Sequence, residues 1–406
     1  MMISPKNMRV CLFDGIHKNG IQVFRDAGFT DIHLFPNSLP EEELYKEIAN
    51  AHIVGIRSKT KLPRKVLAEA KKLLCIGRYG IGVNNVDLSA AEEFGIPVFN
   101  GPFSSTRSVA ELVIGLIFSL FRRIPELSAD MHRGGWSKSA KDCLEVRGKT
   151  LGLVGYGNIA SQISVLAEAL GMKVIYSDVR VVLPLGNARQ MPFEEVLANA
   201  DVVSLHVPGI PSTENMMNAK TLCVMKQGSY LINCARGTVV NIPDLQSALN
   251  SGHLRGAAID VFPKEPKSKD EIFSCELQGT PNVIFTPHIG GATEEAQAAL
   301  GIEVSEKMKA YTLLGDSSMA LNFPQIIPGS IAKETHRLIL IHKNEPGILA
   351  QINDVIAEAQ ANISAQILKT KGSIGVVIVD TEKEIDDAIS EKLSSLSFIS
   401  KCLILS

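Results

Sequence analysis

Short apolar runs alternate with polar, helix-period stretches through residues 1–103. The runs at 10–13, 53–56 and 73–76 have the length of buried strands. Strands that alternate with helices are typical of βαβ units, whose strands form a parallel sheet. The pattern therefore predicts a parallel sheet covered by helices in this part of the chain.

A second series of the same kind begins at Thr150. Its apolar runs are separated by helical spacers and lie at 151–154, 173–176, 202–207, 229–233, 257–261 and 283–285. Such a series predicts a second doubly wound sheet.

Helical segments flank the second series on both sides. Residues 109–124 are apolar on most faces, the hydroxyl side chains before them can cap the first turn, and Pro125 is expected to end the helix. The stretch 293–314 is expected to return the chain to the first domain. The predicted domains are therefore 1–103 joined by 292–325, and 104–291.

The end of the chain follows another pattern. Residues 322–332 hold two prolines and a glycine without periodicity, which is typical of a linker. The segments beyond it follow the order β-α-β-β-α-β, at 338–341, 348–358, 363–368, 374–380, 385–396 and 401–405. That order defines a ferredoxin-like module, so residues 333–406 are predicted to form a third domain.

Composition narrows the class of protein. A formal charge of −2 on 406 residues provides no general field for nucleic acid or an anionic membrane. The longest nearly uninterrupted apolar run, 112–121, is too short to cross a bilayer, and no export signal is visible at the N-terminus. The seven cysteines are scattered and form no CxxC pair, which argues against a disulfide framework and a thiolate metal site. These features favour a cytoplasmic enzyme without a metal.

A glycine-rich turn between a predicted strand and a predicted helix carries the cofactor signature. Gly155 permits the tight turn, Gly157 lets the backbone approach a pyrophosphate, and Ala160 allows close helix packing. Asp178 ends the next strand, where it can accept from ribose hydroxyls and repel a 2′-phosphate, although Arg180 nearby can soften that preference. A glycine motif alone also occurs as a packing turn, but this full order predicts dinucleotide binding, with NAD favoured over NADP.

Three ionisable residues follow three different strands of the second domain: Arg236, Glu265 and His288. The carboxyl ends of parallel strands share one edge of a sheet, so these side chains can converge. Histidine exchanges a hydroxyl proton near neutral pH, a carboxylate orients the imidazole, and arginine grips a substrate carboxylate. Singly, each also fits a surface ion pair or a strand cap. Together they predict hydride transfer between a nicotinamide and a small anionic 2-hydroxy acid.

These residues resemble the D-isomer-specific 2-hydroxyacid dehydrogenases. The resemblance rests on Gly155-Tyr-Gly157, Asn233-Cys-Ala-Arg236-Gly237, Gly256-Ala-Ala-Ile-Asp260-Val-Phe, Glu265-Pro266, Thr286-Pro-His288-Ile-Gly-Gly291 and Gly77-Arg-Tyr-Gly80-Ile-Gly82-Val-Asn-Asn85-Val-Asp87. With the C-terminal module it covers the whole chain. It implies an α/β fold of two doubly wound, Rossmann-like parallel-sheet domains and a ferredoxin-like ACT domain. It also implies NAD as cofactor and Arg236, Glu265 and His288 as the catalytic set.

The resemblance further implies which residues surround the cofactor. They are Gly155, Tyr156, Gly157, Asn158 and Ile159 at the pyrophosphate, Asp178 at the ribose, His206 and Pro208 on the adenine side, and Cys234, Ala235, Arg236, Asp260, His288, Gly290 and Gly291 towards the nicotinamide. For His206, a packing role at a strand end is the alternative.

Within the family the chain is similar to members that oxidise 3-phospho-D-glycerate to 3-phosphohydroxypyruvate, the first step of L-serine biosynthesis. The resemblance implies that Arg57, Ser58 and Lys59 face the substrate phosphate, since two cations and a hydroxyl can clamp an anion. The further implied substrate contacts are Gly80, Ser105, Lys138 and Gln297. The family usually has arginine at the position of Lys59, so this lysine must act as a point charge; the alternative is that it lies in a solvated loop. The family commonly has asparagine at the position of Ser105.

The ACT resemblance implies regulation and assembly. His342, Asn344 and Asn362 are expected to bind L-serine as a feedback effector across an interface between two modules. The alternative is a dimerisation module with unused polar residues. The only tryptophan, Trp136, is expected either to dock on a partner subunit of a dimer or tetramer or to be buried in its own subunit.

Two other functions stay open. One is the same chemistry on another 2-hydroxy or 2-keto acid, such as hydroxyglutarate or glyoxylate, and reduction of 2-oxoglutarate is a further expected activity. D-lactate is disfavoured because it has no second anion for Arg57 and Lys59. The other is an NAD-sensing scaffold on the same fold, which the catalytic residues alone do not exclude.

Overall fold

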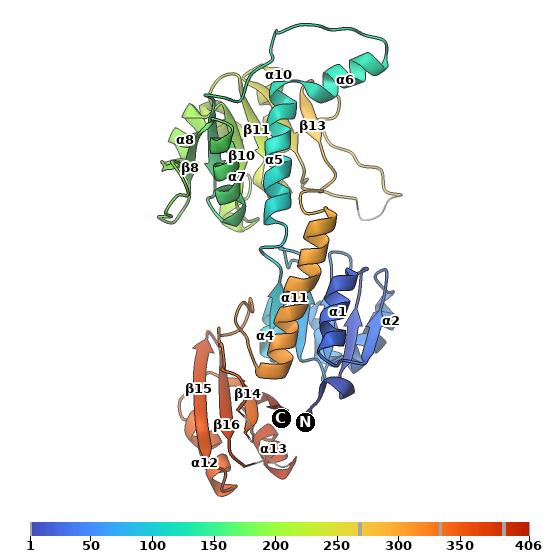
Figure 1. The fold of residues 1–406 in the computed structure, drawn as a ribbon, viewed down its shortest axis with the longest axis vertical. Helices are drawn as coiled ribbons and strands as arrows, with labels where there is room; N and C mark the ends of the chain where they lie inside the picture. Colours follow the sequence, from blue (N-terminus) through green and yellow to red (C-terminus); the bar gives the residue numbers. More distant parts are fainter. Residues whose placement is uncertain (1, 267–269, 333–334, 384–386, 406) are drawn as a thin grey trace. The chain divides into compact units, whose positions relative to one another are not determined.

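The computed structural model describes residues 2–266, 270–332, 335–383 and 387–405 (Figure 1). By their internal contacts the residues form two compact units. Unit 1 comprises Met1–Ser104 and Gln297–Ser406, and unit 2 comprises Ser105–Ala296.

Unit 2 is built on a seven-stranded parallel sheet in the order β13-β12-β11-β10-β7-β8-β9. Its strands are β7 (Thr150–Val154), β8 (Lys173–Ser177), β9 (Arg189–Gln190), β10 (Val202–Leu205), β11 (Ser229–Asn233), β12 (Leu254–Ile259) and β13 (Val283–Phe285). The six strands predicted from apolar runs are confirmed. The short strand β9 was not predicted, because its two exposed polar residues give no hydrophobic signal.

Helices cover both faces of this sheet (Figure 1). They are α5 (Thr106–Phe121), α6 (Ile124–His132), α7 (Asn158–Ala169), α8 (Phe193–Asn199), α9 (Ala219–Val224) and α10 (Ile242–Asn250), with short 3-10 turns at Pro211–Thr213 and Gly237–Val239. Tyr230 and Ile232 of β11 enter the core beside α5 and α7, whereas Leu231 enters the core beside α8, α9 and α10. Burial on both faces explains why these strands are continuous apolar runs.

The predicted helix end at Pro125 is wrong. Helix α5 ends at Phe121, Arg123 adopts a left-handed conformation with φ of 53°, and Pro125 lies in the first turn of α6. The first turn of a helix leaves its N–H groups unpaired, so a residue without an N–H starts a helix there without loss. Helix α6 has no buried residue.

The first sheet of unit 1 is also parallel, in the order β3-β2-β4-β5-β6. Its strands are β2 (Arg9–Leu12), β3 (Asp31–Leu34), β4 (Ile53–Ile56), β5 (Cys75–Arg78) and β6 (Val98–Asn100). The helices of this part are α1 (Lys18–Asp26), α2 (Glu41–Asn50), α3 (Arg64–Glu69), α4 (Leu88–Glu93) and α11 (Glu294–Leu314), with a 3-10 turn at Pro5–Asn7. Strands β3 and β6 were not predicted. None of the residues of β3 is fully buried, and β6 has only three residues, which is too short for an apolar run to stand out.

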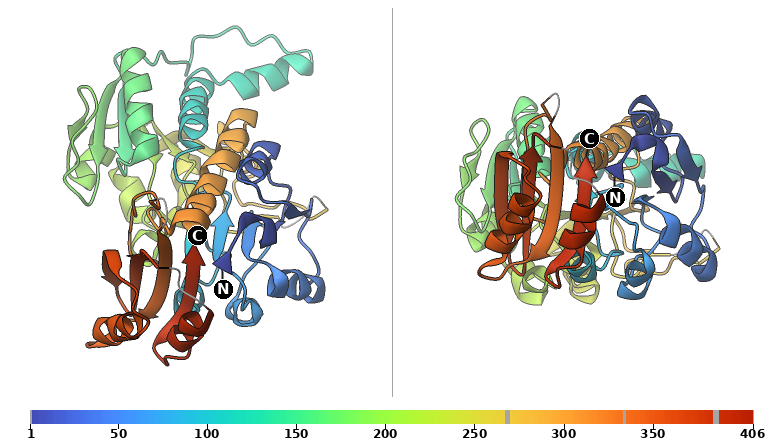
Figure 2. Two further views of the ribbon diagram at one scale, coloured as in Figure 1. Left: turned by 60° about the horizontal axis from the view of Figure 1, so that its bottom comes forward. Right: turned by 90° about the horizontal axis from the view of Figure 1, so that it is seen from below.

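The last part of unit 1 confirms the predicted β-α-β-β-α-β order. It consists of β14 (His336–Lys343), α12 (Ile348–Glu358), β15 (Ile363–Lys371), β16 (Ile374–Thr381), α13 (Asp387–Ser394) and β17 (Ile399–Leu405). The sheet order is β1-β17-β14-β16-β15, and the added strand β1 (Met2–Ile3) pairs in parallel with β17. The first and last strands of the chain therefore lie side by side (Figure 2), which no local pattern predicted.

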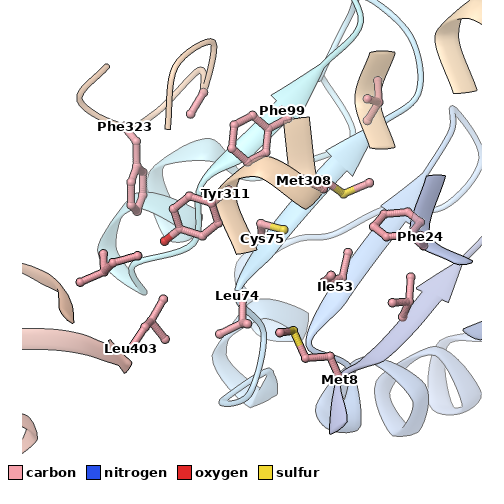
Figure 3. Close-up of a cluster of buried hydrophobic side chains, with 14 of the residues drawn as sticks. Met8, Phe24, Ile53, Leu74, Cys75, Phe99, Met308, Tyr311, Phe323 and Leu403 are labelled. Carbon is pink, nitrogen blue, oxygen red and sulfur yellow. The ribbon is translucent and has the colours of Figure 1, made fainter. Parts of the chain in front are cut away.

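Both faces of the central strand β14 are covered. Leu338 and Leu340 of β14 pack against α12 and α13, whereas Ile339 and Ile341 belong to the large core that contains Tyr311. Figure 3 shows Leu403 of β17 in that same core as Leu74, Tyr311 and Phe323. The C-terminal module and the first sheet of unit 1 therefore share one hydrophobic core.

The segment predicted as a linker contributes to that core. Residues 322–332 contain no helix or strand, as predicted. However, the Asn322 side chain accepts a hydrogen bond from the Val98 N–H and donates one to the Ile96 carbonyl, both with a length of 2.9 Å. Phe323 and Ile326 are buried. The start of this segment is therefore fixed by hydrogen bonds to the β6 region and by burial of its apolar side chains.

A buried ion pair joins β14 and β16. The Arg337 side chain is 3% exposed, and its Nε and Nη2 each donate a hydrogen bond of 2.7 Å to the Asp380 carboxylate. Its Nη1 donates to the carbonyls of Leu314 and Gly329. The guanidinium thus ties the C-terminal sheet to the end of α11.

We expect Asp380→Ala to lower the free energy of unfolding by about 3 kcal/mol, because it leaves a buried guanidinium without its counter-charge. Urea denaturation of the full chain measures this loss. The matched control is Glu358→Ala, which removes an exposed ion pair to Lys392 and should leave the unfolding midpoint almost unchanged. Equal losses in the two variants would contradict the structural role of the buried pair.

Candidate active site

The glycine-rich turn joins β7 to α7 in unit 2. Gly155 has a φ of 87°, and a Cβ built on it would lie 2.5 Å from the carbonyl oxygen of His206, so only glycine fits there. Gly157 is the N-cap of α7, and a Cβ built on it meets no atom of the described chain within 4 Å. The first turn of a helix leaves N–H groups without partners in the helix, and the open space at Gly157 leaves room for a pyrophosphate beside them.

Asp178 follows the next strand, β8, as predicted. Its carboxylate accepts from the backbone N–H groups of Tyr156 at 2.8 Å and Arg180 at 2.9 Å, and its side chain is 10% exposed. Burial alone raises the pKa of Asp178, but the hydrogen bonds from these N–H groups outweigh it, and the pKa lies below its usual value. A fixed negative charge beside the glycine turn suits ribose hydroxyls and opposes a 2′-phosphate.

His206 lies on the other side of the glycine turn. Its Nε2 is 2.9 Å from the Ser204 hydroxyl, and burial lowers the pKa of His206 to about 3, so the ring is neutral. Because its carbonyl abuts Gly155, the packing role considered from the sequence has a structural basis. Pro208 follows two residues later, and its carbonyl accepts from the Thr213 hydroxyl.

His288 and Glu265 meet in direct contact. They follow the neighbouring strands β13 and β12, and the His288 Nδ1 lies 2.9 Å and 3.1 Å from the two carboxylate oxygens of Glu265. One of these oxygens also accepts from the Phe262 N–H at 3.1 Å. With Nδ1 held by Glu265, Nε2 is the nitrogen left for a substrate proton. The His288 side chain is about half exposed, so a ligand can reach it.

Arg236 follows β11, the strand next to β12. Its Nη1 donates to the Ala235 carbonyl at 2.7 Å, and the guanidinium is close enough to affect the pKa of both Glu265 and His288. Burial lowers the pKa of Arg236 from its ordinary value. The structure therefore brings the three predicted catalytic residues to one edge of the sheet.

The electrostatics of the pair suit proton exchange. The hydrogen bond to Glu265 raises the pKa of His288, although desolvation opposes it. Burial raises the pKa of Glu265, but the hydrogen bonds from His288 and the Phe262 N–H outweigh it, and its pKa lies below the usual value. Glu265 is therefore a carboxylate that stabilises the imidazolium form of His288.

Asp260 holds the turn that carries His288. His288 has a left-handed φ of 54°, which is rare for a residue with a side chain. The buried Asp260 carboxylate accepts from the Thr286 hydroxyl at 2.6 Å and from the N–H groups of Ile289 and Gly290 at 2.9 and 3.0 Å, and the Asp260 carbonyl accepts from the His288 N–H. These bonds hold the strained backbone in place.

The other residues predicted towards the nicotinamide lie around this turn. Burial raises the pKa of Cys234, so its thiol stays protonated. Gly291 faces Ser105 at the start of α5, where a Cβ on the glycine would lie 3.1 Å from the serine Cβ. Ser108, which was not predicted as a site residue, donates its hydroxyl to the Gly290 carbonyl at 2.6 Å.

The predicted phosphate-binding residues of unit 1 follow β4. The Arg57 Nη2 donates to the Gln297 side-chain oxygen at 2.5 Å, so two predicted residues lie in contact. Gly80 leaves room for another guanidinium, because a Cβ there would lie 1.5 Å from the Arg78 Nη1. Arg78 ends strand β5 beside Ile56 and was not predicted as a site residue. The sequence signal that could have pointed to Arg78 is a cationic side chain at the end of a buried strand.

Lys138 lies in an exposed segment of unit 2, where its N–H donates to the Trp136 carbonyl. Trp136 is 78% exposed, so unit 2 by itself does not bury it. A pocket of about 300 Å³ is lined by this segment and by Arg123, Glu126, Asp130 and other residues.

The predicted effector residues do not meet within one chain. His342 and Asn344 lie at one end of β14, where the Asn344 side chain donates to the Gly372 carbonyl at 3.1 Å. Asn362 precedes β15 at the other end of the sheet, because Ile363 and His336 both align with Thr381. Seven strand positions separate the two ends, or about 23 Å. A site that uses all three residues therefore needs a second copy of the module.

The described ranges of the chain show neither a metal-binding cluster nor a membrane-spanning helix. Within them, no three or more histidine, cysteine, aspartate or glutamate side chains are grouped to hold a metal ion. None of the helices there combines the length and apolar character needed to cross a membrane. All seven cysteines are free thiols.

A parallel sheet whose glycine turn is held by Asp178 and whose strand ends carry the His288–Glu265 pair defines an NAD-dependent dehydrogenase. Residues 114–290 match the family model of the NAD binding domain of D-isomer specific 2-hydroxyacid dehydrogenases. Residues 338–399 match the model of the AHAS small subunit-like ACT domain.

Relatives match the chain from end to end. D-3-phosphoglycerate dehydrogenase of Dictyostelium discoideum is 47% identical over 97% of this chain and 96% of its own length. The enzyme of the same name from Escherichia coli (strain K12) is 48% identical over 96% of this chain and 94% of its own length. The chain therefore belongs to the D-3-phosphoglycerate dehydrogenases, within the D-isomer specific 2-hydroxyacid dehydrogenase family.

Solved structures agree with this assignment. A protein from Thermus thermophilus has a TM-score of 0.67 at 34% identity and covers 75% of this chain and 96% of its own. D-lactate dehydrogenase with NAD⁺ from Lactobacillus jensenii has a TM-score of 0.64 at 27% identity, over 75% of this chain and 97% of its own.

We expect Glu265→Gln to shift the pH profile of keto-acid reduction. Reduction needs protonated His288 and is lost as pH rises through the His288 pKa, which Glu265 raises. Without that charge, the alkaline limb of kcat/KM moves to lower pH, and kcat falls roughly 100-fold. The exposed Glu195→Gln on α8 is the control and should leave the profile in place. An unshifted limb in Glu265→Gln would show that this carboxylate does not set the His288 pKa.

Proposed function

We propose that this protein oxidises 3-phospho-D-glycerate with NAD⁺ to 3-phosphohydroxypyruvate, the first step of L-serine biosynthesis. The observation that carries the proposal is the His288–Glu265 pair beside Arg236, in a chain that matches D-3-phosphoglycerate dehydrogenases along nearly its whole length. The cations Arg57 and Lys59, which follow β4, and Arg78, which ends β5, suit a substrate with a second anion. The seven free thiols suit the reducing cytoplasm, where we place the enzyme.

In the proposed mechanism, His288 Nε2 takes the hydroxyl proton of the substrate. Glu265 stabilises the imidazolium that forms, and Arg236 holds the substrate carboxylate and polarises the developing carbonyl. NAD⁺, when bound, supplies the hydride acceptor. In the reverse direction His288 returns the proton to the carbonyl oxygen.

We assign the cofactor to residues of unit 2. The turn at Gly155–Ile159 holds the pyrophosphate, Asp178 the ribose, and His206 and Pro208 the adenine side, while Cys234, Ala235, Asp260, Gly290 and Gly291 form the nicotinamide end. The hydrogen bonds of Asp178 and Asp260 support this assignment, because they hold these turns in shape.

We assign the substrate phosphate to Arg57, Ser58 and Lys59, with Gly80, Ser105, Lys138 and Gln297 as further contacts. The Arg57–Gln297 hydrogen bond supports this set, because it fixes the direction of the guanidinium. The domains proposed for these tasks are 1–103 with 292–325 for substrate, 104–291 for NAD and 333–406 for regulation.

L-serine is the proposed effector of the ACT module, and we propose a dimer or tetramer. His342 and Asn344 of one copy and Asn362 of another would share the ligand, which the separation of these residues within one chain supports. Gly347, with a φ of 83°, begins α12 beside Asn344, and a helix N-terminus favours a carboxylate. Inhibition requires L-serine to bind two states of the enzyme unequally.

The direct test is NADH oxidation with 3-phosphohydroxypyruvate, 2-oxoglutarate or pyruvate, each with and without L-serine. We expect the highest kcat/KM for 3-phosphohydroxypyruvate, weaker turnover of 2-oxoglutarate, and inhibition by L-serine that Asn344→Ala reduces at least about ten-fold. Preference for pyruvate would point to another 2-hydroxy acid. Absence of turnover on all three would favour an NAD-sensing scaffold, and equal serine sensitivity in the variant would remove Asn344 from the effector site.

A further inference from the structure

Asp14 is a buried carboxylate that the proposed mechanism does not use. It follows β2, is 8% exposed and adopts a left-handed φ of 64°. Strand β2 pairs in parallel with β4, so the ends of both strands lie side by side. An acidic residue with a strained backbone at such a place usually has a specific task.

The hydrogen bonds of Asp14 go to the loop that follows β4. Its Oδ2 accepts from the N–H groups of Arg57 and Thr60, both at 3.0 Å, and its Oδ1 accepts from the Thr60 hydroxyl at 2.8 Å. The carboxylate therefore holds the first and the last residue of loop 57–60. The two residues between them, Ser58 and Lys59, are exposed.

Asn85 holds the same loop through its carbonyls. Its side-chain N–H groups donate to the Arg57 carbonyl at 2.7 Å and to the Thr60 carbonyl at 2.6 Å. Asp14 follows β2 and Asn85 lies in the turn that precedes α4, yet both bond to residues 57 and 60. Five hydrogen bonds from these two side chains thus fix the curvature of a four-residue loop.

We propose that Asp14 and Asn85 are positioning residues that shape loop 57–60 for the substrate phosphate. The inference rests on the proposed function, because it needs a phosphate at Arg57–Lys59. A loop with fixed ends presents the Arg57 guanidinium, the Ser58 hydroxyl and the Lys59 ammonium in one arrangement, so little conformational entropy is lost on binding. Lys59 depends on this most, because a lysine is a flexible point charge without the planar fork of arginine.

The test compares two substrates that differ only in the phosphate, 3-phosphohydroxypyruvate and hydroxypyruvate, in NADH-dependent reduction. Asp14→Asn removes the charge and leaves the Thr60 hydroxyl facing an amide. We expect it to raise the KM for 3-phosphohydroxypyruvate about ten-fold with little change in kcat, and to leave the KM for hydroxypyruvate nearly unchanged. Asn85→Ala should have the same phosphate-selective effect from the other side of the loop, which covers the case that Asp14→Asn does not fold.

Asp201→Asn is the matched control. Asp201 immediately precedes the buried strand β10, accepts from the Thr150 N–H at 2.8 Å and pairs with Lys226. It is far in sequence from loop 57–60, and we expect a lower melting temperature without a phosphate-selective change in KM. A role of Asp14 in stability alone predicts that pattern for Asp14→Asn as well, and would overturn the inference.

The outcomes separate this inference from the proposed function. A wild-type enzyme that prefers 3-phosphohydroxypyruvate, with variants that keep the full preference, overturns the inference alone. A wild-type enzyme with equal kcat/KM for the two substrates overturns the proposed phosphate site and the inference with it. Selective loss of the phosphate preference in both variants supports both.

Discussion

His288 and Glu265 leave neighbouring parallel strands of unit 2 and meet through a hydrogen bond of 2.9 Å. The rest of the site depends on this contact. It fixes which ring nitrogen faces a substrate, raises the pKa of His288 and keeps Glu265 ionised. The parallel sheet makes the contact available, because it gathers the carboxyl ends of β11, β12 and β13 at one edge.

Three aspartates shape the loops at the strand ends in the same way. Asp178 after β8, Asp260 after β12 and Asp14 after β2 each lie largely buried and each accept backbone N–H groups of a neighbouring loop. Every carboxylate in this set therefore exchanges water for N–H donors, which offsets the cost of burying its charge. The loops that they hold are those assigned to the pyrophosphate, the catalytic histidine and the substrate phosphate.

Periodicity and motif spacing were enough to predict much of the fold. Six strands of unit 2 and the β-α-β-β-α-β order of the C-terminal module appear as apolar runs, because these strands are buried on both faces or pack against helices. The strands β3, β9 and β1 could not be predicted in this way. All three lie at sheet edges, and β3 and β9 have no fully buried side chain. These strands are therefore recognised by their hydrogen bonds to a neighbouring strand, which a hydrophobic pattern does not reveal.

The site shows a similar division. Arg236, Glu265 and His288 were predicted because the chemistry requires those side chains after successive strands. The supporting role of Asp14 was not predicted, because it depends on hydrogen bonds to residues 43 and 46 positions away. The left-handed backbone of His288 was not predicted either, because no residue type in the sequence indicates a positive φ there.

The central claim is that His288 moves the proton during hydride transfer. The measurement that tests it most directly is the single-turnover rate of NADH oxidation by saturating 3-phosphohydroxypyruvate in His288→Asn, together with the dissociation constant of NADH. This account predicts a rate roughly 1,000-fold below wild type with nearly unchanged NADH affinity. A wild-type rate in the variant, or a loss explained entirely by weaker NADH binding, would contradict it.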